Sequence, residues 1–177
     1  LLTLLLPVRM TEVAGSADVQ WLALATFGGA IMASLANIVF GWASDTKGSR
    51  RGWIAVGLAL TIVLLMTIAT LRSPIAIVAA ILVWQVVLNL MLAPLAAWAA
   101  DTVPDSQKGL LGGLISFGPA FGAASSNILT AGFVGGDIAK FGLLCVIIAA
   151  LVLPLLLFGR PLVVAQEPAV DAEHAPR

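Results

Sequence analysis

Residues 41–52 read Gly41-Trp-Ala-Ser-Asp45-Thr-Lys47-Gly48-Ser-Arg50-Arg51-Gly52, a polar segment between two long uncharged, apolar runs. This 41–52 segment holds one acid, three bases and three glycines. Gly48 and Gly52 permit the positive-φ geometry that a short turn between two helices needs. The three bases are the densest basic cluster in the chain, and basic loops of membrane proteins lie on the cytoplasmic side. The segment therefore predicts a cytoplasmic turn between two membrane-spanning helices.

The composition excludes an ordinary soluble domain. Hydrophobic residues make up 60% of the chain, charged residues 10%, and the mean hydropathy is +1.08, whereas about 25% of the residues in soluble domains are charged. Nine bases balance nine acids, so no net charge attracts nucleic acid, and we expect no nucleic-acid partner. The single Cys145 and the single His174 exclude an intrachain disulfide and a Cys/His metal cluster. We expect no cofactor, and we expect Cys145 to pack as a small apolar residue.

Charged residues divide the chain into apolar runs of membrane-spanning length. A helix of about 18 or more uncharged, mainly apolar residues can cross a bilayer core of about 30 Å. Five runs qualify, namely residues 19–44, 52–71, 73–100, 109–136 and 141–159. Leu1 to Val8 are apolar but few, and we interpret them as the end of a truncated first helix. The predicted fold is an all-α membrane protein, a six-helix transmembrane bundle with five complete spans plus a partial first helix.

The bases set the orientation of this bundle. Six alternate in loop order with three others, and the larger set is expected to be cytoplasmic. The larger set is Lys47, Arg50, Arg51, Lys108, Arg160 and Arg177, and the smaller is Arg9, Arg72 and Lys140. Residues 1–160 are then the transmembrane bundle. Residues 161–177, rich in Ala, Pro and acids, are expected to form a disordered cytoplasmic tail or linker.

Two stretches resemble the major facilitator superfamily of secondary transporters. Gly41, Asp45, Gly48, Arg50 and Arg51 fit the pattern Gly-x3-Asp-x2-Gly-x-Arg-Arg of its signature loop. The second stretch resembles the fourth helix, short cytoplasmic link and fifth helix of members similar to glycoside and sucrose symporters. It comprises Asn89-Leu-Met-Leu-Ala-Pro94, Ala100-Asp101-Thr-Val-Pro104-Asp-Ser-Gln-Lys108-Gly109 and Gly118-Pro119.

The resemblance implies a transporter half rather than an enzyme. Members have two six-helix bundles with the substrate held between them, and this chain would supply one, the N-terminal half being favoured over the C-terminal half. The expected partners are the lipid bilayer, the complementary six-helix half, a small solute such as a sugar, and a coupling ion, H+ or Na+. The expected location is the plasma membrane, or the inner membrane of a bacterium.

The resemblance also implies a conformational switch at the 41–52 segment. In the family the loop aspartate lies against a helix of the opposite half, and the loop arginine pairs with an acid at the end of the fourth helix. Asp45, Arg50 and Asp101 occupy those positions. The alternative is an ordinary basic turn that only sets the topology.

Polar residues inside the predicted spans are the candidates for lining a substrate cavity. Gln85 and Asn89 are four residues apart and share one helical face. They either contact the substrate or form an interhelical hydrogen bond. Trp84 would stack on a sugar ring or face lipid, and Asn37 and Asn127 would line the cavity or pack between helices.

Three residues of the fifth span are assigned to helix packing. Gly118 and Gly122, four residues apart, would allow a close helix approach, and Pro119 would bend the helix. No charged residue or histidine lies deep in a predicted span, so a coupling group would belong to the missing first helix or the missing half.

Two other functions are alternatives to transport. A membrane-embedded interaction or sensor module that does not transport stays open, although both cytoplasmic signatures argue against it. An intramembrane enzyme is disfavoured because the sequence has no Gly-x-Ser-x-Gly, no His-Glu-x-x-His and no histidine inside a span.

Overall fold

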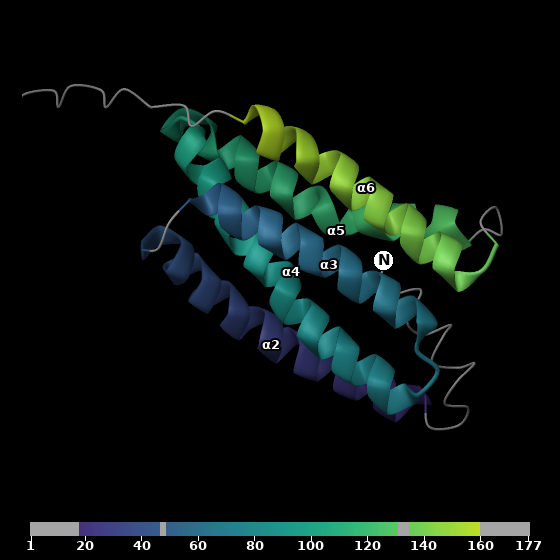
Figure 1. The fold of residues 1–177 in the computed structure, drawn as a ribbon. Coiled ribbons are helices and arrows are strands. Elements are labelled where there is room, and N and C mark those ends of the chain that lie inside the picture. Colours follow the sequence, from purple (N-terminus) through teal and green to yellow (C-terminus); the bar gives the residue numbers. More distant parts are fainter. Residues whose placement is uncertain (1–17, 47–48, 131–134, 160–177) are drawn as a thin grey trace, which may run out of the picture.

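The computed structural model describes residues 18–46, 49–130 and 135–159, and within these ranges it contains helices and no strand. The elements are α2 (Asp18–Thr46), α3 (Arg50–Thr70), α4 (Pro74–Thr102), the 3-10 helix η2 (Asp105–Gln107), α5 (Lys108–Thr130) and α6 (Asp137–Phe158) (Figure 1). The predicted first-helix stub and the predicted tail lie outside the described residues.

Four described helices are long and apolar enough to cross a membrane: α2 from Val19, α3, α4 and α6. The predicted run 109–136 forms α5 over most of its length. Its apolar side chains are interspersed with glycine, serine and asparagine residues, and α5 is not among the candidate spans. The described part of the chain is thus all-helical, with four helices suited to crossing a membrane, while five complete spans and a six-helix count stay predictions.

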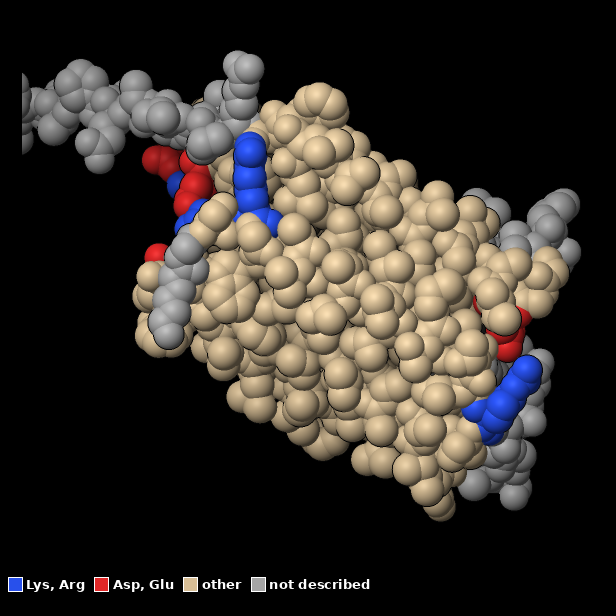
Figure 2. All heavy atoms as spheres, viewed as in Figure 1, with Lys and Arg blue, Asp and Glu red and all other residues tan. Residues whose placement is uncertain are grey.

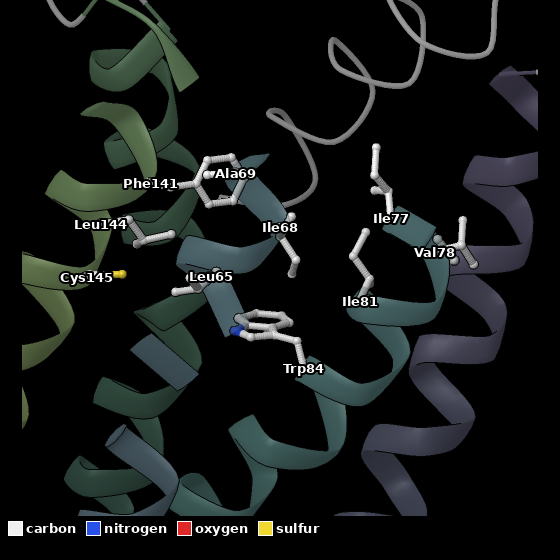
Figure 3. Close-up of a cluster of buried hydrophobic side chains, with 11 residues drawn as sticks. Leu65, Ile68, Ala69, Ile77, Val78, Ile81, Trp84, Phe141, Leu144 and Cys145 are labelled. Carbon is white, nitrogen blue, oxygen red and sulfur yellow. The ribbon is translucent and has the colours of Figure 1, made fainter. Parts of the chain in front are cut away.

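The helices pack as a layered bundle in which α4 is central. Helix α2 runs along one side of α4, α3 runs along another, and α6 packs on α3 (Figure 1). A first buried cluster joins these helices and includes Cys145 at 6% exposure, which agrees with its predicted packing role (Figure 3). Its members are Ala25, Leu65, Ile68, Ala69, Ile77, Val78, Ile81, Trp84, Phe141, Leu144 and Cys145. A second cluster contains Ile54, Leu58, Met91, Trp98 and Val152.

Glycines set the closest approaches between the helices. A Cβ built on Gly57 of α3 would lie 2.7 Å from the backbone nitrogen of Met91 on α4. On α2, a Cβ on Gly28 would lie 3.1 Å from a Leu82 methyl carbon, and one on Gly29 3.2 Å from Nε2 of Gln85. The absence of a side chain at these positions therefore allows α2 and α3 to lie close against α4.

The 41–52 segment differs from the predicted turn. Residues up to Thr46 belong to α2, and α3 begins at Arg50. Gly52 lies in the first turn of α3 and donates its backbone N–H to the carbonyl of Ser49 at 2.9 Å. Among the described residues the one positive φ is that of Gly136, at 75°. The expectation that Gly52 supplies positive φ is therefore wrong, because the helix starts before it; Gly48 lies outside the described residues.

Charged side chains of the described residues are confined to the two ends of the bundle (Figure 2). One end carries Asp45, Arg50, Arg51, Asp101, Asp105 and Lys108, and the other carries Arg72, Asp137 and Lys140. Between the ends, the described residues carry no charged side chain, and their many exposed hydrophobic side chains suit contact with hydrocarbon.

Candidate functional site

Arg50 lies at the centre of an ion-pair cluster at one end of the bundle. Its Nη2 donates to Oδ1 of Asp45 at 2.8 Å, and its Nη1 donates to Oδ2 of Asp101. A guanidinium can serve two carboxylates because its planar fork holds several N–H donors in fixed directions. The Arg50 cluster, defined as Asp45, Arg50 and Asp101, thus joins the ends of α2, α3 and α4. The predicted switch residues Asp45, Arg50 and Asp101 are therefore brought together.

The two carboxylates remain accessible to other groups. The side chain of Arg50 is 26% exposed, whereas those of Asp45 and Asp101 are 53% and 62% exposed. Two acids around one base leave one negative charge, and each carboxylate keeps lone pairs for further donors. Exposed ion pairs contribute about 0–1 kcal/mol to stability. Ion pairs of this strength can stabilise one arrangement of the three helix ends and can also be exchanged for other contacts.

Arg51, the neighbouring base of the motif, has a different partner. Its Cζ lies 5.4 Å from the ring centroid of Trp98, the geometry of a cation–π contact. Trp98 is 9% exposed and belongs to the second buried cluster. Trp98 was not among the residues predicted from the sequence. Its position three residues before Asp101 was the available signal, since this spacing puts both residues on one side of α4.

Three other residues of this end, Asp105, Lys108 and Gly41, stand apart from the Arg50 cluster. Lys108 forms an ion pair with Asp105 in the link between α4 and α5, and its hydrogen bond lowers the pKa of the Asp105 carboxyl. Gly41 lies within α2 and accepts a hydrogen bond from the Ser44 hydroxyl at 2.9 Å. No described atom lies within 4 Å of a Cβ built on Gly41, so the described packing does not explain this glycine.

An amide cluster lies between α2 and α4. Asn37 donates from Nδ2 to Oδ1 of Asn89 at 3.2 Å, and Asn89 donates from Nδ2 to the backbone carbonyl of Gln85 at 2.9 Å. Asn89 is 8% exposed, while Asn37 is exposed. Asn89 therefore forms the interhelical hydrogen bond that was one of its two predicted roles. Gln85 lies against Gly29 of α2, and Asn37 presents the exposed edge of the cluster.

Trp84 is placed differently from both of its predicted roles. Its side chain is 9% exposed and lies in the first buried cluster, extending from α4 toward Leu65 (Figure 3). The lipid-facing alternative is wrong because the indole is buried, and stacking on a sugar needs an exposed ring face. The indole Nε1 has no hydrogen-bond partner in the described part of the chain.

The remaining candidates lie on α5. The side chain of Asn127 is outside the described residues. Gly118, Pro119 and Gly122 are helical, and no described atom lies within 4 Å of a Cβ built on either glycine. The described helices therefore do not form the close contact predicted at these glycines; close approach occurs at Gly57 instead.

A cavity of about 540 Å³ opens at the opposite end of the bundle. It is lined by Ala69, Thr70, Arg72, Gly135, Gly136, Asp137, Ile138 and Ala139. None of the predicted substrate contacts is among these residues. In the described ranges, no group of three or more His, Cys, Asp or Glu side chains could hold a metal ion.

Comparison with known proteins identifies the family. The sequence profile described as Major Facilitator Superfamily matches residues 1–176. No curated protein and no solved structure matches the chain. The family match covers almost the whole chain and agrees with the apolar helices and the charge distribution described above. The chain belongs to the major facilitator superfamily and is a multi-pass membrane transport protein.

Proposed function

We propose that the chain is one six-helix half, the N-terminal half, of a plasma-membrane transporter that works by alternating access. The observation that carries this proposal is the Arg50 cluster, which joins three helix ends at one end of an apolar bundle. In alternating access one bundle rocks against another around a shared site near the midplane. Reversible contacts at the cytoplasmic ends of the two bundles would control this rocking.

The Arg50 cluster serves as the latch in this proposal. Arg50 fixes the directions of the two carboxylates, and their exposed oxygens accept donors from the opposite half. A carboxylate at a helix N-terminus gains typically 0.3–1 kcal/mol. A few contacts of this size shift the populations of two states that differ by a few kcal/mol. These contacts therefore favour the closed arrangement but still allow the transition to the other state.

The proposed solute is neutral and polar, such as a sugar. The described helices offer amide groups and no charged side chain between their ends. An ionic solute would lack a counter-charge among these residues, and burying an unpaired charge is costly. Asn37 is the proposed first contact because it is exposed, whereas Asn89 is covered and positions the Asn37 amide.

Reconstitution tests whether the chain is a half. Residues 1–177 expressed alone are expected to insert in membranes without transporting, since the proposed substrate site is shared with the complementary half. Uptake of radiolabelled neutral sugars is measured in proteoliposomes of the chain alone and of the full-length protein. Uptake by the chain alone, above that of empty vesicles and of its Asp45→Asn variant, would contradict the proposal and favour a homodimer.

A further inference from the structure

Trp98 occupies the place where α3, α4 and α6 meet. Its indole is 9% exposed and packs in the second buried cluster with Ile54 of α3 and Val152 of α6. Trp98 lies about one helical turn before Asp101, at the same end of α4 as the Arg50 cluster. The indole is therefore the large buried side chain nearest along α4 to the ion pairs.

Two contacts enclose this indole from different helices. From α3, the Arg51 guanidinium lies 5.4 Å from the ring centroid, and Arg51 forms no ion pair with a described residue. From α6, the chain passes so close that a Cβ on Gly159 would lie 2.6 Å from Cη2 of Trp98 and 2.4 Å from the carbonyl oxygen of Leu155. An indole and a backbone carbonyl cannot both move aside easily, so this position requires glycine.

Consecutive arginines connect these contacts with the ion pairs. Arg50 binds Asp45 and Asp101, and Arg51 in the next position binds Trp98. Both lie in the first turn of α3, so a displacement of that turn moves both side chains. We propose that Trp98 is a positioning residue that couples the Arg50 cluster to the end of α6 at Gly159.

The coupling has a direct consequence for the end of α6. Release of Asp45 from Arg50 would shift Arg51 and thereby loosen its contact with the indole of Trp98. The indole could then move away from Gly159 at the end of α6. The state of the Arg50 cluster would then be transmitted to Gly159 at the end of α6. This inference concerns one end of the bundle and does not depend on transport, so its failure and the failure of the proposed function are distinguishable.

A fluorine reporter next to Gly159 tests the coupling. Phe158 is 79% exposed, so a Phe158→Cys variant of the protein, in a Cys145→Ala background, accepts a trifluoromethyl label there. The 19F resonance of the label is recorded with and without Asp45→Asn, a change on α2. We expect Asp45→Asn to shift the resonance when Trp98 is present and to leave it unmoved in Trp98→Leu.

Matched variants separate coupling from general damage. Trp42→Leu removes an indole that is 66% exposed on α2, and the response to Asp45→Asn should persist in it. Arg51→Gln should abolish the response while keeping Trp98, which covers the case in which Trp98→Leu does not fold. Gly159→Ala should shift the resonance by itself, and Gly142→Ala, whose Cβ would meet only a Met66 methyl at 4.0 Å among the described atoms, should not. A response to Asp45→Asn of equal size in the Trp98→Leu and Arg51→Gln proteins, or no response in the parent, would overturn the proposal.

Discussion

Arg50, the first residue of α3, donates a hydrogen bond to Asp101 near the end of α4, 51 positions later in the chain. The same guanidinium also binds Asp45 on α2. One side chain therefore fixes the relative positions of three helix ends. Because the side chains of Arg50, Asp45 and Asp101 are all partly exposed, these ion pairs can break and form again during a conformational change at a small cost in free energy.

The hydrogen bond between Asn37 and Asn89 is expected to stabilise the contact between α2 and α4. Asn37→Ala and Asn89→Ala should be non-additive by about 0.6 kcal/mol, the average for such bonds in membranes. A double-mutant cycle of unfolding free energy in detergent micelles measures the coupling. Ser34→Ala, which removes only a bond to the Ala30 carbonyl within α2, is the control. Full additivity of the two asparagine variants would show that the bond contributes nothing.

Gly57→Ala is expected to destabilise the bundle. The new Cβ would lie 2.7 Å from the Met91 nitrogen and 2.8 Å from its Cβ, so α3 and α4 must separate. Overpacking of this kind typically costs about 1–3 kcal/mol. The control, Gly52→Ala, places a Cβ in open space on the same helix and should be neutral or stabilising, since alanine favours helices. Equal stability of both variants, measured by thermal unfolding, would contradict the close approach.

Cysteine labelling distinguishes a cavity from lipid at the amide cluster. Asn37→Cys is expected to react with a small water-soluble thiol reagent in the full-length protein, because Asn37 is exposed in the described chain and is the proposed solute contact. Asn89→Cys should react much more slowly, since Asn89 is 8% exposed. Ile38→Cys, at a neighbouring position that is 70% exposed, serves as the lipid-facing control. Protection of Asn37→Cys in every transport state would place this face in lipid.

The sequence predicted the helices because charges interrupt the apolar runs at their ends. Residues 52–71 and 73–100 became α3 and α4 with small shifts at their boundaries. The start of α3 was missed because positive φ was assumed at Gly52, whereas Ser49 already precedes a helical turn. The pairing of Arg50 with Asp101 was predicted from the family resemblance, since both positions belong to the family's motifs, and the two side chains do form a hydrogen bond.

Contacts that depend on helix register were not predictable from one sequence. Nothing in the composition indicated that Asn37 faces Asn89, or that Gly57 rather than Gly118 marks a close approach. Trp84 and Trp98 look alike as tryptophans in an apolar helix, yet Trp98 meets Arg51 whereas Trp84 lies in the first buried cluster. These differences arise from the relative rotation of the helices, which apolar runs without a clear polar face do not specify.

The latch is tested most directly by the uptake kinetics of Asp45→Asn in the full-length protein in proteoliposomes, with a solute that the unmodified protein takes up. Asp105→Asn, an acid at the same end but outside the Arg50 cluster, is the control. We predict that Asp45→Asn lowers the maximal rate by up to about fivefold, which corresponds to about 1 kcal/mol for an exposed ion pair, while the equilibrium affinity for the solute and the Asp105→Asn kinetics stay close to those of the parent. Loss of equilibrium solute binding with an unchanged rate of conformational exchange would contradict the account.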